Sequence, residues 1–211
     1  MQNYSLFTEN VINDIKLSGK KPSLLLHACC APCASYVIEY LSDFFDITLF
    51  YYNPNISPKT EYDFRLSELA RLCSEHPKAK NIKILPSQYN PEEFFRLAKG
   101  LEELKEGGER CKKCYELRLR KTAEEAKKHG FDFFTTTLTI SPYKNANWLN
   151  EIGENLMKEY GVSYLFSDFK KKNGYKRSIE LSKEYNLYRQ GFCGCVYSKK
   201  ESEMRRLEKN K

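Results

Sequence analysis

The chain has 211 residues, of which 41% are hydrophobic and 30% charged, and these proportions fit a globular protein and exclude extended disorder. No apolar run approaches the ~18 residues of a membrane span, and the first ten residues lack the basic and apolar regions of a secretory signal, so we expect a cytoplasmic protein that does not associate with membranes. The net charge of +7 divides into −1 over residues 1–169 and +8 over residues 170–211. This asymmetry indicates either a polyanion-binding face or a solvated, lysine-rich terminal helix.

Strand and helix patterns alternate along most of the chain. The alternation predicts the α/β class, with a mostly parallel sheet flanked by helices. In chain order the patterns predict strand 23–27, helix 34–41, strand 46–52, helix 59–76, strand 81–85, a helix from Pro91, a charged helix from the CKKC motif at 111–114 to near Gly130, strand 131–140, helix 145–160, strand 163–166, a basic loop over 170–177, a helix over about 178–186 and a last helix over 198–209.

Two parts are expected from this order. Residues 1–169 form an α/β core that carries the metal-binding loops, and residues 170–211 form a basic helical extension with a CGC loop, packed on the core. In parallel sheets the reactive site lies at the carboxyl ends of the strands. The loop ACCAPC comes directly after the first predicted strand, and Thr136, Thr137 and Ser141-Pro142 lie toward the end of the strongest one, so both segments should approach one crevice.

Seven of the eight cysteines fall into three tight groups, namely CCAPC at 29–33, CKKC at 111–114 and CGC at 193–195. In a cytosolic chain of this size, clustered thiols are typical of metal ligands or redox centres rather than structural disulfides. Cys73 lies alone in a predicted helix and is interpreted as a small buried hydrophobe.

The spacing of these cysteines suits a four-thiolate site. The CKKC motif opens a helix, whose N-terminus and basic neighbours favour thiolates. Two pairs of thiolates that meet in space can hold zinc or an iron–sulfur cluster, and the vicinal pair Cys29 and Cys30 is a poor zinc knuckle, which favours the cluster. Gly194 allows Cys193 and Cys195 to face one side, where they would form a reducible disulfide or bind one metal ion. A purely structural metal site with spare thiols is the alternative.

The combination of CCAPC after the first strand, CxxC opening a central helix, TLTISPYKN and FCGC resembles the QueH family over about residues 21–205. The resemblance implies an epoxyqueuosine reductase that removes the epoxide oxygen from epoxyqueuosine at the wobble position of tRNA with a GUN anticodon. It implies an external donor that supplies the electrons. It implies a [4Fe-4S] cluster and a redox-active disulfide or an additional iron ion beside it. The implied cluster ligands are Cys29, Cys30, Cys111 and Cys114, and the implied catalytic residues are Cys193, Cys195 and Cys33.

The first strand and its loop also look like the three-layer nucleotide-binding fold of PP-loop enzymes (the HUP type). Here ACCAPC replaces the Ser-Gly-Gly loop that binds pyrophosphate. Without those glycines the backbone amides cannot approach phosphates closely, so we expect no ATP chemistry.

Reducing an epoxide to an alkene takes two electrons and two protons, and the oxygen leaves as water. Candidates to hydrogen-bond the cyclopentane diol of the substrate are Thr137, Thr139, Ser141, Tyr143 and Asn145. Candidates to bind tRNA phosphates and to stack on a base are Lys170, Lys171, Lys172, Tyr175, Lys176 and Arg177. The alternatives are a metal-free thiol–disulfide oxidoreductase that uses CKKC and CGC, and a non-catalytic, zinc-stabilised RNA-binding module.

Overall fold

The computed structural model describes residues 2–209. Residues 1 and 210–211 lie outside the described residues. They are the outer ends of the predicted core (1–169) and the predicted extension (170–211), and the division between these two parts stays a prediction. In chain order the elements are α1 (Tyr4–Ser18), β1 (Ser23–His27), α2 (Ala31–Leu41), β2 (Asp46–Phe50), α3 (Lys59–Glu75), η1 (Pro77–Ala79), β3 (Lys83–Leu85), α4 (Pro91–Ala98), α5 (Glu109–His129), β4 (Phe133–Thr136), η2 (Thr137–Ile140), α6 (Ala146–Tyr160), β5 (Ser163–Tyr164), α7 (Gly174–Glu184) and α8 (Val196–Lys209).

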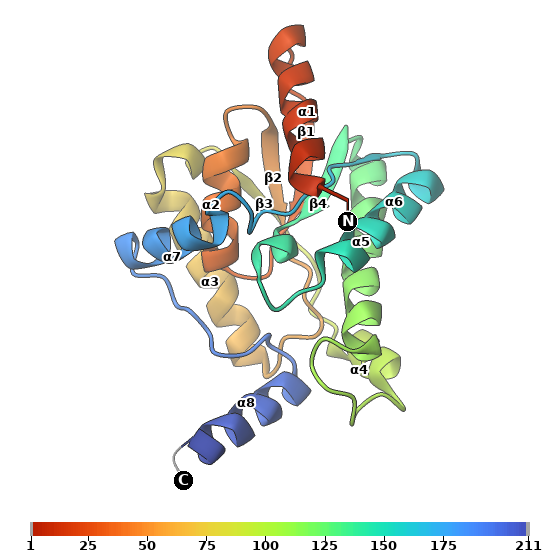
Figure 1. Cartoon of the computed structure of the whole chain (residues 1–211), viewed down its shortest axis with the longest axis vertical. Helices are drawn as coiled ribbons and strands as arrows, with labels where there is room; N and C mark the ends of the chain where they lie inside the picture. Colours follow the sequence, from red (N-terminus) through yellow and green to blue (C-terminus); the bar gives the residue numbers. More distant parts are fainter. Residues whose placement is uncertain (1, 210–211) are drawn as a thin grey trace.

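The five strands form one sheet in the order β3-β2-β1-β4-β5, and each strand is parallel to its neighbours. Along β1, Leu24 and Leu26 enter the core shared with α2 and α3, whereas Leu25 enters the core shared with α5 and α6. Successive residues of a strand point to opposite faces, so a strand covered on both faces is apolar throughout. Figure 1 shows α2, α3 and α7 beside one face and α5 and α6 beside the other. The predicted three-layer α/β fold with a parallel sheet is confirmed.

The strand predicted over residues 131–140 is wrong in its second half. β4 ends at Thr136, and the chain continues as the 3-10 helix η2. Thr136 pairs with His27, the last residue of β1, and its Oγ1 accepts a hydrogen bond from the Leu138 N–H at 3.1 Å. Because β1 ends at His27, the backbone N–H and C=O groups after Thr136 do not pair with it and form hydrogen bonds within a tight turn instead. β2, β3 and β5 are also shorter than predicted.

One helix, α1, is absent from the sequence-based expectations. It packs on the core through Ile12, which is buried, and through Thr8, whose hydroxyl donates to the carbonyl of Phe166 at 2.7 Å. The Tyr4 ring also stacks on Phe166. These contacts join α1 to the loop after β5, and no local motif in the first 20 residues indicates them.

The basic loop predicted over residues 170–177 is helical from Gly174 onward, because α7 begins four residues earlier than expected. Arg177, in the first turn of α7, donates two hydrogen bonds of 2.9 and 2.8 Å to the carboxylate of Glu39 in α2. This bidentate pair anchors α7 to the face formed by α2.

The two terminal helices extend from opposite ends of the molecule, and α8 leads away from the sheet (Figure 1). Within residues 2–209, none of the helices combines the length and the apolar character that a membrane crossing requires.

Candidate active site

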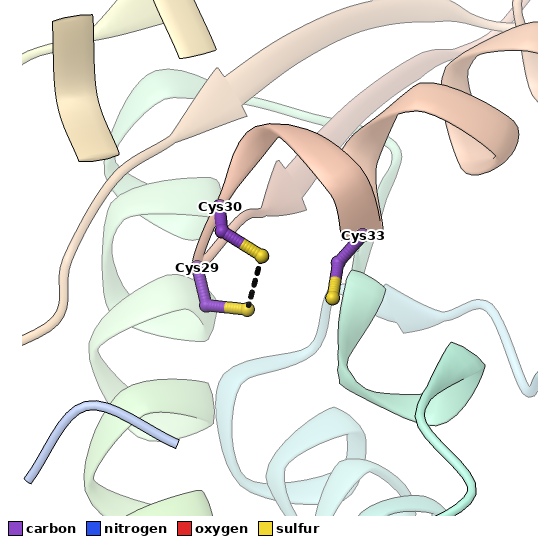
Figure 2. A group of neighbouring side chains, drawn as sticks. All are labelled: Cys29, Cys30 and Cys33. Atoms are coloured by element: carbon purple, nitrogen blue, oxygen red, sulfur yellow. Dashed lines mark hydrogen bonds between the residues drawn. The ribbon is translucent and has the colours of Figure 1, made fainter. Parts of the chain in front are cut away.

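The candidate site begins where β1 ends. β1 lies between β2 and β4, and such a reversal of strand order opens a crevice at the carboxyl ends of the strands. The loop residues Cys29 and Cys30 lie there, and α2 begins at Ala31, three residues earlier than predicted, with Pro32 in its first turn. The early start places Cys33 in that first turn. Figure 2 shows its side chain directed back toward the other two thiols.

Cys29, Cys30 and Cys33 form a compact group of thiols. Their sulfur atoms all lie within 4.8 Å of one another, a separation at which three thiolates can hold one metal ion. Cys29 and Cys30 are buried and Cys33 is half-buried, and the Cys29 thiol donates to the Cys30 sulfur at 3.7 Å. We call these three residues the vicinal group.

The three thiols do not ionise together. Hydrogen bonds from Cys29 and Cys33 hold the pKa of Cys30 well below its usual value. The hydrogen bond to Cys30 raises the pKa of Cys29, and hydrogen bonds to Cys29 and Cys30 raise the pKa of Cys33 well above its usual value. One thiolate is thus stabilised by two neutral thiols, as expected where like charges share a buried site. A bound metal ion would replace the two remaining protons.

The other four clustered cysteines surround a second, smaller cavity of about 10 Å³, roughly the space of one water molecule. Cys111 and Cys114 reach it from the first turns of α5, and Cys193 and Cys195 reach it from the loop before α8. The Gly107 N–H donates to the Cys111 sulfur at 3.2 Å, and the Ser198 N–H donates to the Cys195 sulfur at 3.4 Å. The CKKC and CGC motifs, 82 residues apart from Cys111 to Cys193, therefore face each other.

Cys193 links the two groups, because it lines both the small cavity and a larger one that also contains the vicinal group. The structure thus brings all seven clustered cysteines to adjoining cavities. The grouping differs from the division of roles that the resemblance implies. Cys33 lies with Cys29 and Cys30, and the CKKC cysteines lie with the CGC cysteines.

Buried arginines surround these sulfur atoms. Arg65 of α3 is 1% exposed, pairs with Glu61 at 2.8 Å and donates to the Cys193 carbonyl at 3.0 Å. Arg118 of α5 is also 1% exposed and lines the small cavity. Its Nε donates to the Cys114 carbonyl at 3.2 Å, whereas its Nη2 has no hydrogen-bond partner among the described residues. Within residues 2–209 no carboxylate forms an ion pair with Arg118.

These observations test whether the residues suit a metal centre. A buried guanidinium is costly unless an anion compensates it, and charge on Cys114, Cys193 and Cys29 raises the pKa of Arg118 against the effect of burial. Burial itself raises the pKa of Cys111, and that of Cys114 to about 12, so the expectation that the start of α5 favours thiolates is wrong for the metal-free chain, and a metal ion would have to displace these protons. Thiolates are the ligands that iron–sulfur clusters and zinc prefer. The donor set and the unpartnered Nη2 both fit a negatively charged, sulfur-ligated centre.

The larger cavity has a volume of about 590 Å³ and the vicinal group at one side. Its walls come from the segment after η2, from α7, from residues 189–193 and from α8. Lys144 lines the wall, where burial opposes its charge but the nearby thiols of Cys193 and Cys29 outweigh burial and raise its pKa. The cavity size is typical of sites for small organic ligands.

Two of the five predicted substrate residues, Ser141 and Tyr143, line this cavity. The other three lie elsewhere. Thr137 and Thr139 are fully buried, and the Thr139 hydroxyl hydrogen-bonds to Ser167 at 3.0 Å. The Asn145 side chain caps α6 by accepting the Trp148 N–H at 3.1 Å.

The predicted tRNA-binding residues are also divided by the structure. Tyr175 lines the large cavity. Lys171 and Lys176 are exposed. The other three are engaged in ion pairs within the chain, namely Lys170 with Asp168, Lys172 with Glu9 and Arg177 with Glu39.

Several residues of the site were missed by sequence reasoning. Lys144, Arg189, Arg205 and Arg206 line the large cavity from three separate segments, and no local pattern joins them. Arg118 did carry a signal, because it lies four residues after Cys114 and so on the same face of α5.

One protein family and several named proteins are similar to this chain. The model of the family described as epoxyqueuosine reductase QueH matches residues 24–201. A protein named epoxyqueuosine reductase QueH from Streptococcus pyogenes serotype M1 is 46% identical over 200 residues, which cover 94% of this chain and 78% of that protein. A protein of the same name from Staphylococcus epidermidis is 42% identical, over 93% of this chain and 84% of that protein. Another from Thermotoga maritima is 36% identical, over 83% of this chain and 90% of that protein. On this similarity, which spans both the cysteine motifs and the strands that position them, the chain belongs to the QueH family.

Proposed function

We propose that the chain is an epoxyqueuosine reductase, which removes the epoxide oxygen from epoxyqueuosine at the tRNA wobble position to give queuosine. One observation carries the proposal. Seven cysteines from three distant segments meet at adjoining cavities, and the larger cavity, of about 590 Å³, has room for a modified nucleoside beside the sulfur atoms. The name that the relatives share agrees with this chemistry.

The cofactor of the proposed reaction is a [4Fe-4S] cluster held by Cys29, Cys30, Cys111 and Cys114. Cys193, Cys195 and Cys33 would hold an additional iron ion or, for the CGC pair, act as a redox-active dithiol. When bound, the cluster supplies single electrons and the iron ion polarises a C–O bond as a Lewis acid. Cys193 lines both cavities and so joins the vicinal group to the CKKC cysteines, which supports a shared centre rather than two separate sites.

The chain's own residues bind the substrate and supply protons. The reaction consumes two protons, and the Lys144 ammonium on the cavity wall holds one near neutral pH. Burial opposes its charge, but the neighbouring Cys193 and Cys29 outweigh burial and raise its pKa. We assign the proton that accompanies C–O cleavage to Lys144 Nζ. Lys144→Met should then lower kcat with little effect on RNA affinity.

Cys193→Ser tests the central proposal. Cys193 lines both cavities, so its replacement should abolish turnover of epoxyqueuosine-containing tRNA while the absorbance of the reconstituted cluster is retained. Cys73→Ser is the matched control, because Cys73 is buried in α3 away from both cavities. Turnover by Cys193→Ser at the wild-type rate would contradict both the iron and the dithiol roles.

Metal analysis separates the proposal from its alternatives. Anaerobic preparations should contain iron and sulfide, and removal of iron by a chelator should abolish activity. A colourless, fully active protein would favour the thiol–disulfide oxidoreductase, and stoichiometric zinc without iron would favour the RNA-binding module. Since the relatives are named as reductases, neither alternative is favoured.

tRNA is the proposed macromolecular partner. The charge of +8 over residues 170–211 supports electrostatic binding of its backbone, which should weaken steeply as salt is raised. Of the basic segment over 170–177, the exposed Lys171 and Lys176 are the residues most available for phosphates. Affinity that does not change with salt would contradict this role.

A further inference from the structure

The mouth of the large cavity carries arginines without carboxylate partners. Arg189 and Arg206 both line the cavity, and neither forms an ion pair with any carboxylate of residues 2–209. Arg189 Nη1 donates to the Ser182 hydroxyl at 3.0 Å. The Arg206 guanidinium lies so close to Gly191 that a Cβ there would be 2.7 Å from its Nη2. Two cations are thus held at one opening with their charges uncompensated.

This arrangement contrasts with that of the neighbouring basic segment. In 170–177, three cationic side chains are neutralised by carboxylates within the chain, which reduces the field they offer to an external anion. Arg205, next to Arg206 on α8, is intermediate, because its guanidinium lies 3.6 Å from Glu106. Lys171 and Lys176 also form no ion pair within residues 2–209, but they do not line the cavity. The unpaired positive charge at the cavity mouth is therefore that of Arg189 and Arg206.

Aromatic rings lie at the same opening. Tyr143 is 77% exposed and lines the cavity, and it is the most exposed aromatic side chain of the described residues. Tyr175 lines the cavity beside Arg189, whose guanidinium carbon lies over its ring at 5.9 Å from the ring centre. Tyr175 is half-buried and Tyr143 exposed. Accessible rings beside unpaired guanidinium groups are what proteins use to stack unpaired bases and to hold the phosphates between them.

We propose that Tyr143, Tyr175, Arg189 and Arg206, here called the rim, form the contact surface for the unpaired nucleotides on either side of the target nucleotide of an RNA loop. The cavity has room for one nucleoside, so the flanking bases stay at its mouth, where Tyr143 and Tyr175 stack on them. Arg189 and Arg206 contact the phosphates. The inference rests on the proposed function and deepens it, because it assigns recognition of a single-stranded loop to residues that line the reaction cavity.

RNA binding by the intact chain tests the rim. The probe is a fluorescently labelled anticodon stem-loop RNA with a GUN anticodon, and a fully paired hairpin of equal length serves as the comparison. Wild-type protein should prefer the open loop. Tyr143→Ala should weaken binding to that loop at least about 5-fold, since stacking contributes on the order of this factor or more per base, and Tyr143→Phe should restore it. Arg206→Ala should weaken binding and reduce the slope of log affinity against log salt by about 1.

Lys200→Ala is the matched control for Arg206→Ala, because it removes one positive charge from the exposed side of the same helix at a residue that does not line the cavity. It should bind the loop within about 2-fold of wild type. The proposal is overturned if Tyr143→Ala and Arg206→Ala bind the open loop like wild type. Equal weakening by Lys200→Ala, or equal affinity of wild type for both RNAs, also overturns it.

The outcomes separate this inference from the proposed function. If wild-type protein reduces epoxyqueuosine while the rim variants bind the loop normally, the function stands and the rim assignment is wrong. If binding depends on the rim as described while the iron-loaded protein does not reduce epoxyqueuosine, the rim stands and the proposed function is wrong.

Discussion

Gly194→Ala is the most informative single change in the CGC loop. Gly194 has a φ of +131°, a region that residues with a Cβ rarely adopt, and its carbonyl accepts the Ser57 N–H at 3.0 Å. A Cβ at this position would lie 3.0 Å from Ile56 Cγ1 and 3.1 Å from Arg65 Nη1. Arg65 Nη1 in turn donates to the Cys193 carbonyl. The added methyl group therefore presses on the contact that positions the loop.

Gly194→Ala should lower the free energy of unfolding for two reasons. A strained backbone conformation costs on the order of 1–3 kcal/mol, and crowding in a well-packed region adds about 1 kcal/mol or more, for a total of about 2–4 kcal/mol. Gly161→Ala is the matched control, because Gly161 has a φ of +72° and no atom within 4 Å of the added Cβ. Only the left-handed backbone cost of about 1–2 kcal/mol applies there.

Urea unfolding of the chelated, metal-free variants under anaerobic conditions measures both losses. Gly194→Ala should lose about 1–2 kcal/mol more unfolding free energy than Gly161→Ala and should retain less iron after reconstitution, because Cys193 and Cys195 are displaced. Equal losses in the two variants, with equal iron content, would refute the description of the loop as held against Arg65 and Ile56.

Three further predictions concern buried groups. Arg118→Met should bind less iron than the surface control Arg120→Met, yet its metal-free unfolding free energy should stay within about 1 kcal/mol of wild type, because it removes a buried cation that no carboxylate of residues 2–209 compensates. Wild-type iron content in Arg118→Met would contradict this. Burial raises the pKa of Cys73 to about 11, so about one thiol in a thousand is ionised at pH 8 and alkylation of the folded chain, followed by mass spectrometry, should be slow. Because the unfolded chain loses this proton near pH 9, stability should fall from pH 9 to 11, and Cys73→Ala should lessen that fall. Thr8→Val leaves the Phe166 carbonyl without its donor and should cost about 1–2 kcal/mol in urea unfolding, whereas Thr8→Ser should cost less.

Local sequence patterns were sufficient for the fold class and for the position of the first cysteine loop. The all-apolar run of β1 and the helical spacing that follows it depend only on neighbouring residues, and parallel strands place their carboxyl ends on one edge. The presence of CCAPC at the end of β1 was therefore predictable. The placement of CKKC at the start of α5 was also predictable, because the positions of both motifs depend only on residues within one or two helical turns.

The tertiary structure alone decided which thiols meet. Cys193 lies between the two cavities because the loop before α8 returns to α3 and α5, and nothing within that loop indicates its contact with Arg65. The tertiary structure also decided which positive charges are paired. Lys170, Lys172 and Arg206 are all cations in the sequence, but Lys170 pairs with Asp168 and Lys172 with Glu9, whereas Arg206 pairs with no carboxylate of the described residues. Propensity and periodicity act over a few residues, whereas ion pairing, burial and the distance between sulfur atoms depend on how remote segments pack.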